Sequence, residues 1–473
     1  MIFNDNDCIA AISTPAGTGG IAIIRLSGQD AFSIADKMIS RSKKGVLSAF
    51  VSEMADHTIE HCYVFDFADP SAPELIDECL VSKMAAPRTY TTENVVEINS
   101  HAGLAVVTRI LDLALRCGAR AAEPGEFTRR AFLGGRIDLS SAEAVIDVIN
   151  AKTEDSRKAA VSALSGTLGA EINSLCALLS EAIADLDVSI DYPEYEFDAE
   201  MGALAADRIN TVLGRLKTLS DTYYAGRIAK EGLRMVIAGP PNAGKSTLMN
   251  TLCGVDRSIV TDIPGTTRDT IEEFLQLEGI PVWVTDTAGI HETDDTVEKI
   301  GISRTISALS DANIVLYVID PDSFSGEEDV ALAKSLLDPV NSFILINKAD
   351  IPRSDCRRDE IIAAFAPEYC AMNISAKNGL GLDALLAKIK QAFRIGAVDF
   401  GYSPVLTSSR HKQLIDQAIS LLEQATGCYS GNMPLDFVSY DIRQASGKLC
   451  EITGKNVTDE IINSIFDRFC VGK

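Results

Sequence analysis

The chain has 473 residues, enough for about two to four domains, and 46% of them are hydrophobic, an ordinary fraction for a globular protein. Its 67 acidic and 43 basic side chains give a formal net charge of −24, which argues against a generally basic nucleic-acid binder but leaves room for RNA on a local patch. No apolar run approaches the roughly 18 residues of a membrane span, the acidic N-terminus is unlike a signal peptide, and the 11 cysteines are scattered, so we expect a cytoplasmic protein with reduced thiols and no membrane partner.

The first stretch, residues 1–120, predicts an α/β domain. Short apolar runs typical of strands occur at Ile21–Leu26, Cys62–Phe67 and Val95–Asn99. A helical pattern follows over Leu104–Cys117.

The second stretch, residues 121–226, is expected to be helical, because the strand signal disappears and apolar residues recur at helical spacing. The pattern includes Ile172, Leu175, Leu179, Ile183 and Leu186. The segment 191–195 ends that helix, since Pro193 restricts the residue before it. The helical pattern returns in residues 396–473, so these two stretches predict one helical domain with an insertion.

The insertion, residues 227–395, alternates strands and helices. Its strand-like runs are Arg234–Ala238, Val282–Thr285, Ile314–Ile319, Phe343–Ile346 and Ala371–Ile374. Alternation of this kind predicts a largely parallel sheet covered on both faces. The predicted fold class is therefore multidomain α/β plus all-α.

A glycine-rich loop, residues 239–247 (GPPNAGKST), follows the first strand of the insertion and opens a helix. Its glycines let the backbone approach phosphate oxygens, and successive N–H groups form an anion nest. We expect Lys245 to reach the β- and γ-phosphates and Ser246 to bind Mg²⁺. The insertion is therefore expected to be a Ras-like P-loop domain.

Three further motifs complete the expected nucleotide site, and two of them concern the base. Asp286–Gly289 (DTAG) ends a strand, where a carboxylate can hold the Mg²⁺ shell and a glycine N–H can sense the γ-phosphate. In the NKAD motif 347–350, Asp350 can accept protons from N1 and N2 of guanine, a donor pair that adenine lacks. Residues 375–377 (SAK) would close over the base. An ATPase or an inactive P-loop fold is the weaker interpretation.

The residue after the DTAG motif is Ile290, where small signalling GTPases have the glutamine that orients the attacking water. Another group must therefore do so. Glu298 could hold the water directly or through a second water, or it could be a solvated helix residue. Asn242 could bind a monovalent cation beside the phosphates, or it could shape the loop. A switch threonine within residues 266–269 would complete the metal shell.

The chain resembles the MnmE (TrmE) family of tRNA-modifying GTPases over nearly its whole length. The G-domain segments GPPNAGKSTLMN, TDIPGTTRD, DTAGI and NKAD carry this resemblance, with the N-terminal runs 21–28 (IAIIRLSG) and 88–98 (RTYTTENVVEI). The block 124–139 (PGEFTRRAFLGGRIDL) and the C-terminal FCVGK at 469–473 are specific to this family among GTPases.

The resemblance implies an enzyme that works with a flavin-binding partner, MnmG (GidA), in a heterotetramer. Together they add an aminomethyl or carboxymethylaminomethyl group to C5 of the wobble uridine of certain tRNAs. The one-carbon unit comes from 5-formyl-tetrahydrofolate or a related folate, which the N-terminal domain binds. That domain also forms a homodimer, and the G domains dimerise with the aid of K⁺ to drive GTP hydrolysis.

Carried over residue by residue, the resemblance assigns a ligand set to each site. K⁺ would be bound by Asn242, Thr261, Ile263 and Thr266, and Mg²⁺ by Ser246 and Thr267. Glu298 matches the water-orienting glutamate of the family. Folate would be bound by Arg25, Glu97, Arg136 and Lys473, because cations suit its glutamate tail and a carboxylate suits the pterin N–H donors. The residues expected to contact GTP are Asn242, Ala243, Gly244, Lys245, Ser246, Thr247, Thr261, Asp262, Ile263, Pro264, Gly265, Thr266, Thr267, Asp286, Thr287, Ala288, Gly289, Asn347, Lys348, Ala349, Asp350, Ser375, Ala376 and Lys377.

Two assignments stay open at this point. Cys470 is the C-terminal cysteine of the family and could have a chemical role or be a buried structural thiol. A set of basic residues could contact tRNA phosphates or could form solvated helix faces. This set comprises Arg129, Arg130, Lys152, Arg157 and Lys158.

A regulatory GTPase of ribosome assembly is the competing interpretation. Such switches usually append an RNA-binding module after the G domain. Here the C-terminal segment is helical and acidic, without a G-x-x-G loop on a basic face. The tRNA-modifying enzyme is therefore the leading hypothesis.

Overall fold

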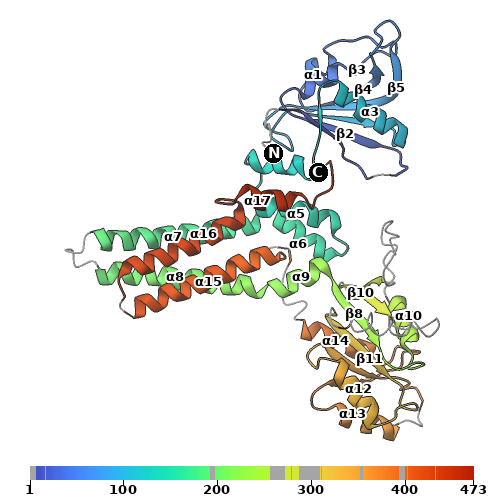
Figure 1. Cartoon of the computed structure of the whole chain (residues 1–473), viewed down its shortest axis with the longest axis vertical. Coiled ribbons are helices and arrows are strands. Elements are labelled where there is room, and N and C mark those ends of the chain that lie inside the picture. Colours follow the sequence, from blue (N-terminus) through green and yellow to red (C-terminus); the bar gives the residue numbers. More distant parts are fainter. Residues whose placement is uncertain are drawn as a thin grey trace. The chain divides into compact units, whose positions relative to one another are not determined.

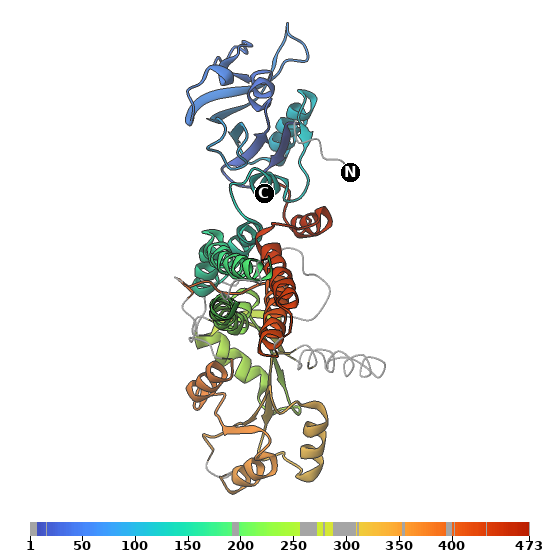
Figure 2. The ribbon, with the colours of Figure 1, turned by 90° about the vertical axis from the view of Figure 1, so that its left-hand side faces the viewer.

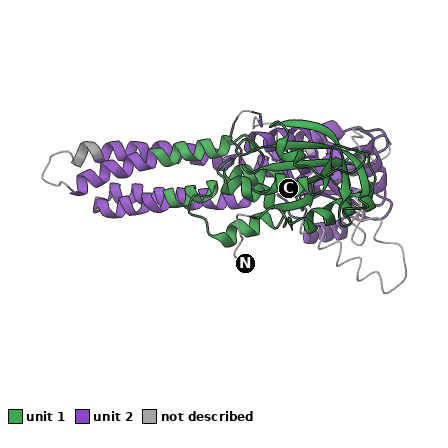
Figure 3. Ribbon diagram, turned by 90° about the horizontal axis from the view of Figure 1, so that it is seen from above, with its two compact units in different colours: residues 1–146, 164–177, 446–473 green, residues 147–163, 178–445 purple. Residues whose placement is uncertain are grey.

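The computed structural model describes residues 7–15, 17–191, 198–255, 272–277, 280–286, 309, 312–351, 355–393, 400–401, 403–431 and 433–472. The chain divides into two compact units, coloured separately in Figure 3. Unit 1 comprises residues 1–146, 164–177 and 446–473, and unit 2 comprises residues 147–163 and 178–445.

Unit 1 is built on a seven-stranded sheet with the order β3-β4-β5-β6-β2-β1-β7. Neighbouring strands are antiparallel, except that β1 and β7 pair in parallel. The strands are β1 (Ile9–Ile12), β2 (Ala22–Ser27), β3 (Ile39–Ser40), β4 (Thr58–Asp66), β5 (Glu74–Met84), β6 (Val95–Ser100) and β7 (Arg120–Ala121). The helices are α1 (Ala31–Asp36), α2 (Phe50–Glu53), α3 (Leu104–Arg116), α4 (Glu126–Leu133) and α17 (Asp459–Phe466), with most of α5 (Leu139–Asn150).

The core of unit 1 lies between this sheet and the helices α1 and α3. Ile24 and Ile98 face each other across β2 and β6, and neither side chain is exposed to solvent. Helix α3 contributes Val107, Ile110 and Leu113, whose spacing of three residues places them on one helix face. Because the apolar side chains on one face of the sheet must stay buried, the register of its strands is fixed.

The C-terminal end of the chain returns to unit 1, as Figures 1 and 2 both show. Val471 forms an isolated β-bridge with Pro124. Gly472 has φ +96°, and a Cβ there would stand 2.3 Å from the Ile12 carbonyl oxygen, so only glycine lets the chain pass this close to β1. The two ends of the sequence thus build one structural unit.

Unit 2 contains a six-stranded sheet with the order β13-β12-β11-β8-β10-β9. All pairs are parallel except β9 with β10. The strands are β8 (Leu233–Ala238), β9 (Glu272–Leu277), β10 (Ile280–Asp286), β11 (Ile314–Ile319), β12 (Ser342–Ile346) and β13 (Cys370–Asn373). Every residue of β11 and β12 is buried, as expected for parallel strands covered on both faces.

The described helices of unit 2 fall into two groups. Those of the sheet domain are α10 (Lys245–Val255), α12 (Glu327–Leu336), α13 (Asp355–Phe365) and α14 (Leu382–Ala392). The others are α6 (Glu154–Leu164), α7 (Thr167–Asp191), α8 (Asp198–Asp221), α9 (Tyr223–Glu231), α15 (Ser409–Ser430) and α16 (Leu435–Thr453), of which α6, α7 and α16 also contribute residues to unit 1. Arg208 on α8 forms ion pairs with Glu181 and Asp185 on α7, which ties these long helices together.

The predicted multidomain α/β plus helical architecture is confirmed. Each strand-like run in the insertion lies within or one residue beyond an observed parallel strand. The apolar runs did not predict β1, β3, β5, β7 or β9, and β5 is instructive because four of its 11 residues are charged. Charged residues break up the apolar run by which a strand is recognised, whether they are exposed like Glu74 and Glu78 or buried like Lys83. None of the described helices combines the length and apolar character needed to span a bilayer.

Candidate functional site: a nucleotide loop in unit 2 and an arginine–tyrosine cluster in unit 1

The phosphate loop leaves the carboxyl end of β8, which lies between β10 and β11. Gly239 has φ +139°, and a Cβ there would stand 2.2 Å from the Val318 carbonyl oxygen. Gly244 has φ +99°, and a Cβ there would stand 2.2 Å from Nδ2 of Asn347. Only glycine fits at both positions, so the loop can present its N–H groups at short range to phosphate oxygens.

Lys245 is the first residue of α10 and is buried. Its ammonium donates to the carbonyl oxygens of Gly239 at 2.9 Å and Pro240 at 2.8 Å, which holds the charge inside the loop. Ser246 is exposed beside it, as a hydroxyl that binds Mg²⁺ would have to be. Asn242 adopts a left-handed backbone with φ +61°, so it shapes the loop, and a role in cation binding stays a prediction.

Asn347 joins the phosphate loop to the base-recognition segments. Its amide nitrogen donates to the Ala243 carbonyl oxygen at 2.8 Å, and its amide oxygen accepts from the Ala376 N–H at 2.9 Å. Asn347 is only 4% exposed. Thr251 on α10 adds a bond from Oγ1 to the Ala376 carbonyl oxygen, a contact that the motifs did not predict. Buried bonds of this kind fix the distance between the phosphate end and the base end.

Asp350 is exposed at the base end of the site. Its carboxylate accepts a hydrogen bond from Oγ of Ser375 at 2.8 Å. This bond is the main reason why the pKa of Asp350 lies below its ordinary value. The carboxylate is thus both ionised and oriented, which suits an acceptor for two guanine N–H groups.

Part of the expected nucleotide site lies outside the described residues. These positions are Thr261, Asp262, Ile263, Pro264, Gly265, Thr266, Thr267, Thr287, Ala288, Gly289 and Glu298. Asp286 is the last residue of β10, where its backbone pairs with Ile237 of β8. The predicted DTAG motif therefore begins at the same sheet edge as the phosphate loop.

In unit 1, three of the four residues assigned to folate lie together. Arg25 and Glu97 are direct partners in the register of β2 with β6, and both Nε and Nη2 of Arg25 donate to Oε1 of Glu97 at 2.8 Å. The guanidinium carbon of Arg136 stands 4.6 Å from the ring centroid of Tyr90, and that of Arg25 stands 5.5 Å from it. Lys473, the fourth, lies outside the described residues.

Two further residues complete what we call the arginine–tyrosine cluster (Arg25, Tyr90, Glu97, Phe127, Arg136 and Gly472). The Phe127 ring of α4 lies 5.5 Å from the guanidinium of Arg25, and the Gly472 carbonyl oxygen accepts from Nη1 of Arg25 at 3.4 Å. The cluster combines cations, a carboxylate and the tyrosine ring, a set that fits an aromatic ligand with an anionic tail. Phe127 is fully buried, so it supports Arg25 and does not meet a ligand itself. The sequence analysis missed Tyr90 and Phe127.

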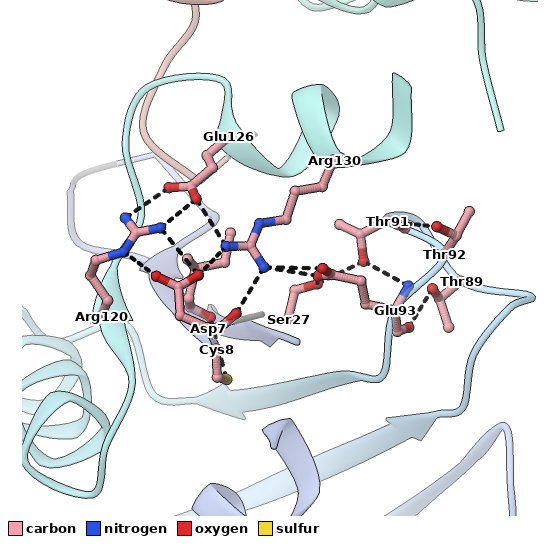
Figure 4. A network of polar contacts seen from close by, with 11 residues as sticks. Asp7, Cys8, Ser27, Thr89, Thr91, Thr92, Glu93, Arg120, Glu126 and Arg130 are labelled. Atoms are coloured by element: carbon pink, nitrogen blue, oxygen red, sulfur yellow. Dashed lines mark hydrogen bonds and ion pairs between the residues drawn. The ribbon is translucent and has the colours of Figure 1, made fainter. Parts of the chain in front are cut away.

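An ion network, drawn in Figure 4, fastens α4 to the beginning of β1. Arg130 on α4 donates to Asp7 at 2.6 Å, to Glu126 at 3.0 Å and to Glu93 at 3.1 Å, and Arg120 donates to Asp7 and Glu126 at 2.6 Å. Burial acts to raise the pKa of Asp7, but the bonds from both arginines hold it below its ordinary value. The network stabilises the helix that carries Phe127 into the cluster.

The network corrects one expectation about tRNA. Arg130 was a candidate phosphate contact or a solvated helix residue, but it is only 9% exposed and its charge is neutralised within the protein. Arg157 is exposed and pairs with Glu154 on its own helix. Lys152 places its ammonium 4.0 Å from the ring centroid of Trp283. Cys470 is exposed and has no disulfide, so it is not a buried structural thiol.

The parallel sheet, the phosphate loop on an inner strand and the linked base-recognition segments together define a P-loop GTPase. Era bound to MgGDPNP and a 16S ribosomal RNA segment has 28% sequence identity, covering 34% of this chain and 56% of that chain, with a TM-score of 0.28.

Two family models match nearly the whole chain, one described as the GTP-binding protein TrmE N-terminus over residues 8–136 and one as the MnmE helical domain over residues 139–470. Curated proteins named tRNA modification GTPase MnmE match over 99% of this chain and 99% of their own length, at 44% identity in Acetivibrio thermocellus and 42% in Geobacillus kaustophilus. The Bacillus subtilis relative is 40% identical over 99% of this chain and 100% of its own. The chain belongs to the MnmE (TrmE) family of tRNA modification GTPases, and the resemblance inferred from the motifs is confirmed.

Proposed function

We propose that this GTPase works with a flavin-dependent partner, MnmG (GidA), in a heterotetramer. The complex adds an aminomethyl or carboxymethylaminomethyl group to C5 of the wobble uridine of certain tRNAs, in the cytoplasm. The observation that carries the proposal is the match over 99% of the chain to relatives named tRNA modification GTPase MnmE. The homodimer formed through unit 1 belongs to the same proposal.

The one-carbon donor, 5-formyl-tetrahydrofolate or a related folate, binds at the arginine–tyrosine cluster in this proposal. The folate supplies the one-carbon unit, and the protein binds and orients it. Arg136 and Lys473 attract the glutamate tail, and Glu97 accepts from the pterin N–H donors. The support is the geometry of the cluster, where the guanidinium carbons of Arg25 and Arg136 lie 5.5 Å and 4.6 Å from the centroid of the Tyr90 ring.

GTP hydrolysis proceeds without the usual glutamine. Ile290 cannot hydrogen-bond through its side chain, so Glu298 orients the attacking water. Ser246 and Thr267 hold Mg²⁺, and Asn242, Thr261, Ile263 and Thr266 hold K⁺ when two G domains dimerise. A cation at that position would neutralise charge that develops in the transition state.

Nucleoside analysis of tRNA from cells that lack this protein tests the proposed modification. We expect the C5-modified wobble uridine to disappear and to return when the wild-type gene is restored. Unchanged C5 modification would refute the proposal and would favour the ribosome-assembly switch, whose loss should instead alter ribosomal subunit profiles.

The hydrolysis scheme has its own test. GTP turnover is compared in K⁺ and Na⁺ buffers of equal ionic strength, for wild type and Glu298→Ala. We expect faster turnover in K⁺ and a loss of roughly 10²-fold or more in the variant, a range typical of general acid–base or water-positioning groups. Equal rates in the two salts would count against the Asn242 cation site, and unchanged turnover in the variant would remove Glu298 from the mechanism.

A further inference from the structure

Arg358 is a buried arginine on α13, outside every motif used to find the nucleotide site. It is 5% exposed. Its Nη2 donates to the carbonyl oxygen of Lys348 at 2.5 Å and to that of Ile351 at 2.8 Å. These two carbonyls lie on either side of Ala349 and Asp350. One guanidinium nitrogen thus spans the turn that carries the guanine-binding carboxylate.

The turn needs such support because Lys348 adopts a left-handed backbone, with φ +60°. A side chain with a Cβ is strained in that conformation, which persists only where the surroundings determine it. Lys348 is held at both ends, since its carbonyl oxygen accepts from Arg358 and its ammonium forms an ion pair with Asp320 at 2.6 Å. The Ile351 N–H closes the turn by donating to the same carbonyl at 3.0 Å.

The position of the turn decides where the Asp350 carboxylate points. Ser375 orients this carboxylate through a hydrogen bond from its Oγ at 2.8 Å. Arg358 also adds positive charge behind the turn, and this charge is one of the smaller causes that keep the pKa of Asp350 low, after the bond from Ser375. A carboxylate must be ionised and correctly aimed to accept from both N1 and N2 of guanine.

We propose that Arg358 is a positioning residue for guanine selectivity. It holds the main chain of residues 348–351 so that the Asp350 carboxylate meets both N–H donors of the base. The two bonds described above go to the main chain of residues 348 and 351, whereas the phosphate loop is held by Lys245 and Asn347. Loss of Arg358 should therefore weaken recognition of the base more than it weakens the chemistry at the γ-phosphate.

The neighbouring arginine is a matched control. Arg357 lies on the same helix and carries the same charge, but it is exposed. Its Nη1 donates to the carbonyl oxygens of Pro321 and Asp322, both at 3.2 Å, in the segment after β11. Replacing Arg357 removes a cation and two main-chain bonds without touching the base-recognition turn.

The test measures the affinity of the full-length protein for GDP and for IDP, which lacks the N2 amino group, by titration calorimetry. We expect wild type to prefer GDP by about tenfold or more, because IDP leaves one acceptor of Asp350 without its donor. In Arg358→Met the preference for GDP over IDP should fall to about threefold or less, mainly because GDP binds more weakly. Arg358→Lys should be intermediate, since an ammonium reaches the carbonyls as a point charge only.

Three variants carry the predictions that could overturn the proposal. Arg357→Met should keep the wild-type ratio of GDP to IDP affinity. In Arg358→Lys, kcat at saturating GTP should stay within about twofold of the wild-type value. A wild-type GDP-to-IDP ratio in Arg358→Met, or an equal loss in Arg357→Met, would overturn it. If circular dichroism shows that Arg358→Met does not fold, Arg358→Lys decides alone: a reduced ratio supports the proposal and an unchanged ratio refutes it.

Discussion

The base-recognition end of unit 2 and the arginine–tyrosine cluster of unit 1 keep polar groups ready for a ligand in different ways. At the base end, Asn347 makes the buried structural bonds, while Asp350, the residue proposed to bind guanine, accepts from Ser375 and is exposed. In the cluster, Arg25 and Glu97 are both assigned to the ligand, yet they are bonded to each other at 2.8 Å.

This difference has consequences for binding. A guanine base meets a carboxylate that is already aimed, so little reorganisation is needed and discrimination can be strong. A ligand of the cluster must compete with an internal ion pair, and each new bond to it replaces an existing one. A small distortion of the nucleotide site should therefore lower its ligand affinity strongly. Removal of one charge from the arginine–tyrosine cluster should lower the affinity of that site less.

The largest effect is expected from Gly244→Ala, which distorts the nucleotide site. The new Cβ would stand 2.2 Å from Nδ2 of Asn347, so this amide must move and give up its bonds to Ala243 and Ala376. We expect GDP affinity to fall roughly 10³-fold, about 4 kcal/mol, as measured by calorimetry.

A glycine on α10 provides the control for that variant. A Cβ at Gly254 would meet no atom within 4 Å. Gly254→Ala should bind GDP like wild type and should be more stable by about 0.5–1 kcal/mol, because alanine is the better helix former. GDP binding by Gly244→Ala within tenfold of this control would show that the contact with Asn347 relaxes without cost.

The described part of the candidate nucleotide site could be anticipated from short motifs because its parts are contiguous and made largely by the backbone. Each motif directly follows a strand, and parallel strands bring their carboxyl ends to one edge of the sheet. Arg358 could not be anticipated, because nothing in the sequence distinguishes it from the exposed Arg357 beside it. Which of two adjacent helix residues is buried depends on how α13 packs, and a pattern of two arginines does not contain that information.

The cluster in unit 1 lies beyond what motif spacing can predict. Its members at positions 25, 97, 136 and 472 are brought together by the register of β2 with β6 and by the returning C-terminal end. Only the family resemblance suggested Arg25, Glu97 and Arg136, and it gave no reason to include Tyr90 or Phe127. The prediction that Arg130 contacts tRNA phosphates or solvent was wrong. Charged helix residues are usually solvated, and its partners Asp7 and Glu93 come from distant segments of the sequence.

The second prediction concerns the ion network that holds α4 and hence Phe127. Glu126 is 4% exposed and accepts from Arg120 at 2.6 Å and from Arg130 at 3.0 Å. Glu126→Gln removes a charged partner from both arginines. We therefore expect the free energy of unfolding of unit 1 to fall by about 3 kcal/mol at pH 7. Hydrogen exchange of the α4 amides measures this loss. The control is Glu60→Gln, which changes an ion pair between the half-buried Glu60 and the exposed Arg41 and should cost less than about 1 kcal/mol.

The pH dependence of that loss follows from the pKa of Glu126. Burial acts to raise it, but bonds from Arg120, the Glu123 N–H and Arg130 hold it below its ordinary value of 4.5. A carboxyl whose pKa is lower in the folded state contributes stability above its unfolded value and loses it as the pH falls. The difference between wild type and Glu126→Gln should thus be full at pH 7 and shrink below about pH 4.5. A constant difference would mean that Glu126 contributes by shape rather than charge.

The third prediction tests the arginine–tyrosine cluster and rests on the proposed folate site. Arg25→Met removes a guanidinium that lies over both Tyr90 and Phe127. Because the variant lacks one of the cations that suit the anionic glutamate tail, we expect 5-formyl-tetrahydrofolate to bind about tenfold more weakly. Arg41→Met, in an exposed ion pair of the same unit, should bind like wild type. An unchanged affinity in Arg25→Met would remove the cluster as the folate site.

The smallest expected effect concerns a contact between the helical part and the sheet of unit 2. The ammonium of Lys152 stands 4.0 Å from the ring centroid of Trp283 and 5.0 Å from that of Phe274. Trp283 Nε1 in turn donates to the carbonyl oxygen of Glu231, the last residue of α9, at 3.0 Å. Lys152→Met keeps the length of the side chain but removes the cation, so we expect a loss of about 0.5–1 kcal/mol in stability.

Trp283 is the only tryptophan in the chain, so its fluorescence reports on this contact directly. Lys152→Ala should expose the ring face and increase quenching by acrylamide, whereas Lys152→Met should leave quenching near the wild-type value, because its side chain still covers the ring. Equal quenching in all three proteins would show that the lysine does not cover the ring in solution. Because β10 ends at Asp286, the first residue of the DTAG motif, the wild-type signal with GDP and with a GTP analogue also measures whether the nucleotide alters this junction.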